Sequence, residues 1–292
     1  MPRPRDVLRE QVRAVWAALR LPAVAVAAVA ALGTLFVMLD ILSTGVAIDF
    51  RPEYQMLPSA LGLLFPIGVW RGVKRFGADF LWTLPVDRRR HVLARVFAGW
   101  TWLMAAVAVF LLWLLAMTLV SGGRVLVDET LLVLPDPGWG ADPIDPAVLK
   151  RVPWPTQPLL WLVPFTAATG TYLLASTLAL GTRHPLRWIV GVVLALLLLG
   201  VIGDLTRTKW LHAAPERAAE LVLGGRYGMD ALLTARTESL KIDVPLTTGE
   251  RVVVWRGVPD LGEWALATLL WTGAGLIVLW AAASRHRERR RA

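Results

Sequence analysis

Six stretches of this chain are apolar over about the length of a bilayer crossing, which leaves few folds open. A helix needs about 20 residues to cross the hydrocarbon core, and none of these stretches contains Asp, Glu, Lys or Arg. The chain is also 56% hydrophobic, against about 45–50% in soluble domains even when glycine is counted. We therefore predict an all-α polytopic membrane protein with six transmembrane helices. The predicted spans are Leu21–Leu39, Gln55–Trp70 (kinked at Pro58 and Pro66), Val96–Val120, Pro158–Gly181, Trp188–Gly203 and Trp264–Ala283.

The basic residues gather at the ends of these stretches. The chain has 31 Lys and Arg against 22 Asp and Glu, a net charge of +9. Because basic residues resist translocation, a basic cluster beside a span marks the cytoplasmic side. On that rule both termini and residues 71–95 and 182–187 are cytoplasmic, whereas residues 121–157 and 204–262 lie outside. We expect a multi-pass protein of the plasma membrane. Charge placed at span ends fits a membrane surface better than a nucleic-acid groove.

The two ends of the chain are polar and basic. Residues 1–20 have the pattern of an amphipathic helix, in which apolar positions such as Val15 and Leu19 alternate with Arg13 and Arg20. We expect this helix to lie on the cytoplasmic surface and lead into the first span. Spans one to five then occupy residues 21–203, and residues 263–292 form the sixth span and a basic cytoplasmic tail.

Residues 71–95, between the second and third spans, place an apolar segment between two basic clusters. Phe76, Phe80 and Leu84 recur at helical spacing, which predicts a short amphipathic helix along the membrane surface. Pro85 should end this helix, because residues before a proline avoid the α region. Asp87 then has the position of an N-cap for a helix that begins at Arg88.

The sequence from Asp79 to Arg90, DFLWTLPVDRRR, resembles the cytoplasmic segment after the second span in permease subunits of type-2 ATP-binding-cassette (ABC) exporters. In that family a glycine and a small residue precede an acidic residue, an apolar stretch, Leu-Pro-Val and a basic run. Here Asp79 stands where the family usually has Glu, and Gly77 is one position closer to the proline. Six spans with a large outer insertion before the last one extend the similarity.

The resemblance implies a subunit that forms a translocation pathway as a homodimer or heterodimer. It also implies a separate ATPase subunit, which carries ATP and Mg and contacts the cytoplasmic segment. The matching residues that would make this ATPase contact are Asp79, Phe80, Leu81, Trp82, Leu84, Pro85 and Arg88. A simpler interpretation of Arg88 to Arg90 stays open, in which they are a topology signal and contact lipid headgroups.

Motifs for chemistry within the chain are missing from the sequence. No G-x-x-x-x-G-K-[ST] loop is present to hold ATP phosphates, and no G-x-S-x-G or H-E-x-x-H motif supports a hydrolase. The chain has no cysteine, and its histidines are far apart at span ends or in loops. The spans lack the midplane carboxylates usual in proton- or sodium-coupled carriers. We therefore expect no catalytic, cofactor or metal site in this chain, and no enzyme activity of its own.

The outer loops contain patterns of local structure. Residues 124–134 have strand-like composition, and residues 136–145 contain three aspartates that we interpret as a solvated loop in preference to a calcium site. Residues 215–223 and 230–235 have the pattern of short helices. Residues 240–245 and 251–256 are expected to form a β-hairpin, with the strand at 124–134 joining its edge.

The fourth span carries small and weakly polar residues at helical spacing. Such residues allow close helix packing within the chain, or alternatively a dimer interface or pathway surface. The candidates for that second role are Thr166, Thr169, Gly170, Tyr172 and Ser176. For the whole chain, the alternative to an exporter subunit is a non-transporting membrane scaffold or a lipid-binding subunit of another complex. A polytopic membrane enzyme is the weakest interpretation.

Overall fold

The computed structural model describes most of the helical part of the chain. The described residues are 4–45, 47–52, 56–70, 88–125, 129–133, 150–154, 157–182, 187, 191, 194–195, 198–199, 202, 222, 227–235, 242–245, 251–254 and 260–285.

Helix α1 (Pro4–Thr44) is continuous over 41 residues, with Pro22 inside it. Residues 4–20, predicted as a surface helix that leads into the first span, are continuous with that span in one helix. At 1.5 Å per residue α1 is about 60 Å long, which exceeds the full thickness of a bilayer, about 40–45 Å. Its basic end therefore extends along the axis of the span.

Helix α2 (Leu57–Val69) is shorter than the predicted second span, at 13 residues. Pro58 lies in its first turn, where a missing N–H costs nothing, and Pro66 lies inside the helix. A helix of this length reaches about 20 Å, less than the hydrocarbon core of about 30 Å. The prediction of a full second crossing by helix alone is therefore not met.

Three further long helices complete the bundle. Helix α3 (Arg88–Val120) begins at the predicted residue. A 3-10 helix, η4 (Pro158–Leu162), leads directly into α4 (Val163–Gly181), and α8 (Leu261–Arg285) contains the predicted sixth span. Among the described residues, α1, α3, η4 with α4, and α8 give four helices that are long and apolar enough to cross a membrane. Most of the predicted fifth span lies outside the described residues, although Gly191, Leu194, Ala195, Leu198, Leu199 and Ile202 are helical.

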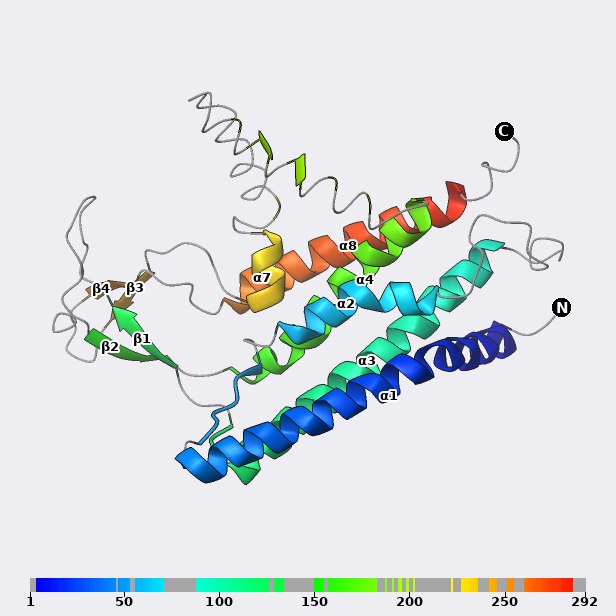
Figure 1. The fold of residues 1–292 in the computed structure, drawn as a ribbon. Coiled ribbons are helices and arrows are strands. Elements are labelled where there is room, and N and C mark those ends of the chain that lie inside the picture. The colour runs from blue at the N-terminus through cyan, green and yellow to red at the C-terminus, as the bar shows by residue number, and fades with distance from the viewer. Residues whose placement is uncertain are drawn as a thin grey trace.

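Helices α2, α4 and α8 run in the same direction, as their contacts show (Figure 1). Thr166 and Leu173 of α4 lie beside Trp264 and Gly275 of α8, in the same order along both helices. Gly62 and Phe65 of α2 likewise meet α4 at Ala168 and then Tyr172. Parallel neighbours need a connection that returns along the bundle. Between Thr182 and Leu261, where the fifth apolar stretch occurs, the chain must therefore return from the end of α4 to the start of α8.

Helices α1 and α3 run in the opposite direction to these three. Trp100 of α3 donates to Thr169 of α4, whereas Val96, one turn earlier, accepts from Tyr172, which lies later in α4. The start of α1, the end of α2, the start of α3 and the ends of α4 and α8 consequently gather at one end of the bundle (Figure 1). We call this the terminal end.

Two small antiparallel sheets lie beyond the opposite end of the bundle (Figure 1). Strands β3 (Ile242–Pro245) and β4 (Arg251–Val254) pair as the predicted hairpin. Strand β1 (Glu129–Val133) pairs with β2 (Lys150–Trp154), which was not predicted. Among the described residues, β1 and the hairpin belong to two separate sheets, so the expectation that this strand joins the hairpin edge is wrong. Strands β1 and β4 nevertheless lie close together.

Short polar contacts join the chain segments at the sheet end. Phe50 N donates to Arg124 O at 3.0 Å, and Arg124 N donates to Asp49 Oδ1 at 2.9 Å. Gly123 is needed here, because an added Cβ would collide with the carbonyl of Ile48. Helix α7 (Met229–Thr234), predicted at 230–235, packs against α4 and α8. The predicted helix at 215–223 and the aspartates of 136–145 lie outside the described residues, apart from Val222.

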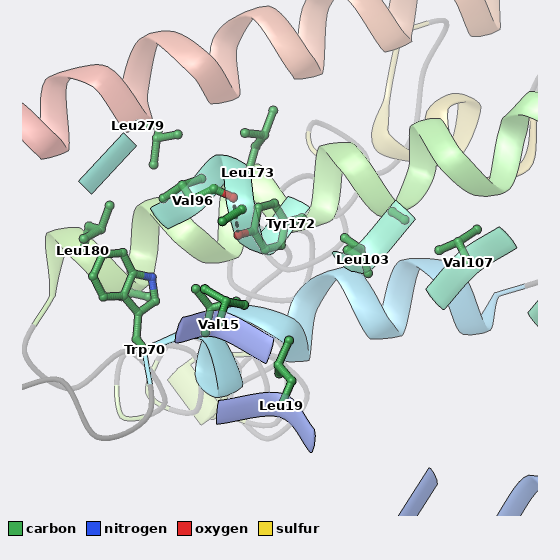
Figure 2. Packing of buried hydrophobic residues seen from close by; sticks show 14 of the residues in the cluster. Val15, Leu19, Trp70, Val96, Leu103, Val107, Tyr172, Leu173, Leu180 and Leu279 are labelled. Carbon is green, nitrogen blue, oxygen red and sulfur yellow. Dashed lines mark hydrogen bonds between the residues drawn. The ribbon is translucent and has the colours of Figure 1, made fainter. Parts of the chain in front are cut away.

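Helix α4 is the centre of the apolar core (Figure 2). The core residues of α4 include Tyr172, Leu173 and Leu180. They pack with residues from the other four bundle helices: Val15 and Leu19 of α1, Val69 of α2, Val96, Leu103 and Val107 of α3, and Leu279 of α8. By contrast, the apolar part of α1 exposes Leu21, Val24, Val26, Leu32, Leu35, Phe36, Leu39 and Leu42. Large exposed apolar faces of this kind suit a helix surrounded by lipid.

Candidate functional site

The predicted ATPase-contact residues lie almost entirely outside the described part of the chain. This holds for Asp79, Phe80, Leu81, Trp82, Leu84 and Pro85, while Arg88 is the first residue of α3. The structure does describe the two points that flank residues 71–87 in the chain, Trp70 at the end of α2 and Arg88 at the start of α3. The side chains around these two points form the candidate site, at the terminal end of the bundle.

Arg95 connects α3 to the end of α2. It is only 7% exposed, and its Nε and Nη2 donate to the carbonyl oxygen of Val69 at 3.0 and 2.7 Å. Val69 is the last residue of α2, so its carbonyl has no donor four residues further along the helix. A cation also complements the partial negative charge at a helix C-terminus. Arg95 therefore acts as a C-cap for α2, supplied from the neighbouring helix.

The guanidinium of Arg95 also faces the ring of Trp70. Its Cζ lies 5.5 Å from the ring centroid, within the range of a cation–π interaction. Trp70 is buried, and its backbone N–H donates to Pro66 O at 3.0 Å, which completes the last turn of α2. The last described residue before position 71 is thus held by both backbone and side-chain contacts.

Tyr172 connects the same turn of α3 to α4. Its hydroxyl donates to the carbonyl oxygen of Val96 at 2.8 Å, and the residue is fully buried. Gly99 permits this approach, since a Cβ at that position would collide with the tyrosine hydroxyl. Ser176, one turn after Tyr172, is also fully buried. The Oγ of Ser176 and the Nε1 of Trp70 have no hydrogen-bond partner among the described residues.

The remaining candidates on α4 contact other elements of the same chain. Thr169 accepts from Trp100 Nε1 at 3.1 Å, and Thr166 accepts from Trp264 Nε1 at 3.2 Å. Gly170 faces Leu232 of α7, with room for no Cβ unless the leucine moves. Packing within the chain accounts for these contacts. A dimer-interface or pathway role for Thr166, Thr169, Gly170, Tyr172 and Ser176 stays a prediction.

The start of α3 also contacts the end of α8. The Cζ of Arg89 lies 4.7 Å from the ring centroid of Trp280. This contact, together with Arg95 and Tyr172, ties the first two turns of α3 to three other helices. Among the described residues, no group of three His, Asp or Glu side chains could hold a metal ion. The contacts of Arg89, Arg95 and Tyr172 attach the start of α3 to the ends of the neighbouring helices.

Sequence reasoning missed Arg95 and Trp70 as site residues. Arg95 belongs to the basic residues at 71–95 that mark the cytoplasmic side, and Trp70 enters the prediction only as the last residue of the second span. One signal was available, because Arg95 stands alone between the apolar runs 92–94 and 96–98. A lone arginine in such a context must either reach solvent or find acceptors inside the protein.

No family model matches this chain, and no curated protein or solved structure matches it.

Proposed function

We propose that this chain is the membrane-spanning permease subunit of an ABC exporter. With a second permease subunit it would form the translocation pathway, and separate ATPase subunits carrying ATP and Mg would drive it through residues 71–95. The observation that carries the proposal is the resemblance of Asp79–Arg90 to the cytoplasmic segment of such subunits.

The arrangement of the bundle supports the proposal. Both ends of residues 71–87 lie at the terminal end, together with the beginning of α1 and the end of α8 (Figure 1). The two sheets and α7 lie towards the opposite end. An exporter of this kind needs its ATPase contact and its outer elements on opposite sides of the membrane. The basic clusters at 71–95 and at the two termini favour the cytoplasm for the terminal end.

Residues 71–87 connect α2 to α3 in the sequence, which suggests how the ATPase would act. ATP binding and hydrolysis on the partner would displace this segment, and the displacement would reach α2 through Trp70 and α3 through Arg88. Alternating access would follow as these helices change their position relative to the rest of the pathway. In this mechanism the chain itself carries out no covalent chemistry.

The test is loss of the ATPase when the apolar side of residues 71–87 is removed. Fully burying a Phe or Leu side chain contributes about 1.5–3 kcal/mol, so Phe80→Ala with Leu84→Ala should weaken ATPase association by about 100-fold or more. The chain would be purified from cells that naturally produce it. Mass spectrometry would then identify any stoichiometric partner with a phosphate-binding loop, and ATP turnover of the complex would be measured.

The matched control is Arg90→Ala. Arg90 is exposed on the first turns of α3 and should be dispensable for ATPase binding. Full ATPase binding by the double alanine variant would reduce residues 71–95 to a membrane anchor. A stoichiometric partner without ATPase activity would favour a scaffold in another complex.

A further inference from the structure

We infer that Arg95 and Tyr172 are positioning residues that lock α2, α3 and α4 into one unit at the terminal end, so that a displacement of residues 71–87 is transmitted to α4. The existence of the lock follows from contacts within the described chain. Its role in transmission rests on the proposed function.

The first part of the lock joins α2 and α3, the two helices that residues 71–87 connect in the sequence. Arg95 lies two helical turns after Arg88, and it holds the carbonyl of Val69 with two N–H groups. Two donors on one rigid guanidinium plane define both distance and direction. The end of α2 cannot move away from α3 without breaking both of these buried hydrogen bonds.

The second part of the lock extends the unit to the central helix. The residue that follows Arg95 in α3, Val96, offers its carbonyl to Tyr172 at 2.8 Å. One turn of α3 therefore holds α2 through a side chain and α4 through a backbone oxygen. Gly99 and Val69 line the same contact, since a Cβ on Gly99 would lie against both the Tyr172 hydroxyl and Val69.

Helix α8 is attached to this unit differently. The side-chain hydrogen bond between α4 and α8, from Trp264 to Thr166, lies towards the sheet end. At the terminal end α8 meets the unit through apolar packing of Leu279 and through the ring of Trp280. Apolar surfaces slide more readily than paired hydrogen bonds break. A displacement at the terminal end is therefore shared by α2, α3 and α4 before it reaches α8.

The lock is tested first by hydrogen exchange on the chain alone in lipid nanodiscs. Loss of a charge-assisted hydrogen bond in Arg95→Met should accelerate amide exchange at residues 66–70 by about tenfold or more, with little change in the first turn of α2. Arg95→Lys, which keeps the charge but not the planar pair of donors, should give an intermediate rate. Tyr172→Phe should leave residues 66–70 protected and accelerate exchange at the start of α3.

Transmission is tested in the complex with the copurified ATPase. Leu178→Cys places a thiol on a partly exposed position of α4, and the chain has no other cysteine. Its labelling rate should change between the nucleotide-free and the vanadate-trapped complex. In Arg95→Met and Tyr172→Phe the ATPase should stay bound and active, but the change in labelling at position 178 should be lost.

Leu103→Ala is the control for general destabilisation, because it opens the core without touching either hydrogen bond. It should keep the nucleotide-dependent labelling. Unchanged exchange at residues 66–70 in Arg95→Met would overturn the lock. Changed exchange with normal labelling at position 178 would overturn transmission through it. If no ATPase copurifies with the parent chain, the proposed function fails, and the exchange result alone decides whether the lock exists.

Discussion

Two charged side chains, Arg95 and Asp260, close helix ends at opposite ends of the bundle. Arg95 provides donors to the C-terminus of α2, and Asp260 provides an acceptor to the N-terminus of α8. Both charges have the sign that the helix dipole favours at that position. Asp260 directly precedes α8 and its side chain contacts the first residues of that helix, so its role depends on local sequence. The role of Arg95 depends on a helix 26 residues away, which local sequence does not reveal.

Removal of the Asp260 side chain should destabilise the start of α8. Its Oδ1 accepts from the N–H groups of Gly262 and Glu263 at 2.8 and 3.0 Å, and its own N–H donates to Ala235 O at 3.0 Å. Asp260→Ala should lower the free energy of unfolding by about 1 kcal/mol, as is usual for an N-cap. The measurement is denaturant unfolding of the purified protein. Asp260→Asn keeps an acceptor oxygen and should retain most of the stability; equal losses in both variants would argue against capping.

At the scale of elements, helix boundaries were predicted well where the chain carries a local signal. The start of α3 at Arg88 and the hairpin of β3 and β4 follow from a proline and from a short turn, respectively. The boundary expected inside α1 marked a change from polar to apolar composition, and such a change does not end a helix. Pro22 did not end it either. The pairing of β1 with β2 escaped prediction because it spans a long loop, and because Pro153 lies inside β2.

The crossing of α2 and α4 should tolerate no side chain at Gly62. An added Cβ would overlap Thr171 Oγ1 and the carbonyl of Ala168, so α2 would have to move away from the central helix. Overpacking of this kind typically costs about 1–3 kcal/mol, which we expect for Gly62→Ala in an unfolding experiment. Gly33→Ala in α1, where no atom lies within 4 Å of the new Cβ, is the matched control. It should be neutral or stabilising by about 0.5–1 kcal/mol, because alanine favours a helix more than glycine does.

At the scale of the whole molecule, apolar periodicity predicted the helical membrane class but not the number of crossings. Four helices have spanning length, α2 is shorter than a crossing, and the fifth stretch is described at few residues. Helix length alone does not give the number of crossings. The parallel packing of α4 and α8 adds information, because the chain must return from the end of α4 to the start of α8. The predicted ATPase contact could be located from sequence only as a segment. The lock formed by Arg95 and Tyr172 depends on contacts among α2, α3 and α4, so it could not be located from the sequence.

The last prediction concerns which side of the membrane each end of the bundle faces. The start of α1 and the end of α8 lie at the terminal end, whereas β3 and β4 lie towards the other end (Figure 1). The basic clusters favour the cytoplasm for the terminal end. Since the natural chain has no cysteine, single cysteines report on one position each. An impermeant thiol reagent applied to intact cells should label Thr248→Cys, in the loop that joins β3 to β4.

The same reagent should reach Ala292→Cys only after the cells are opened. Thr248 is a better outer position than Ser121, because the Ser121 hydroxyl accepts from Ile48 N at 3.1 Å and helps to hold two segments together. Labelling of both cysteines in intact cells would mean that the chain crosses the membrane an even number of times, or not at all, between these positions, so that α8 would not be the single crossing that the bundle directions imply. The reverse pattern, with only Ala292→Cys labelled, would invert the bundle and place residues 71–95 outside, where no ATPase could reach them.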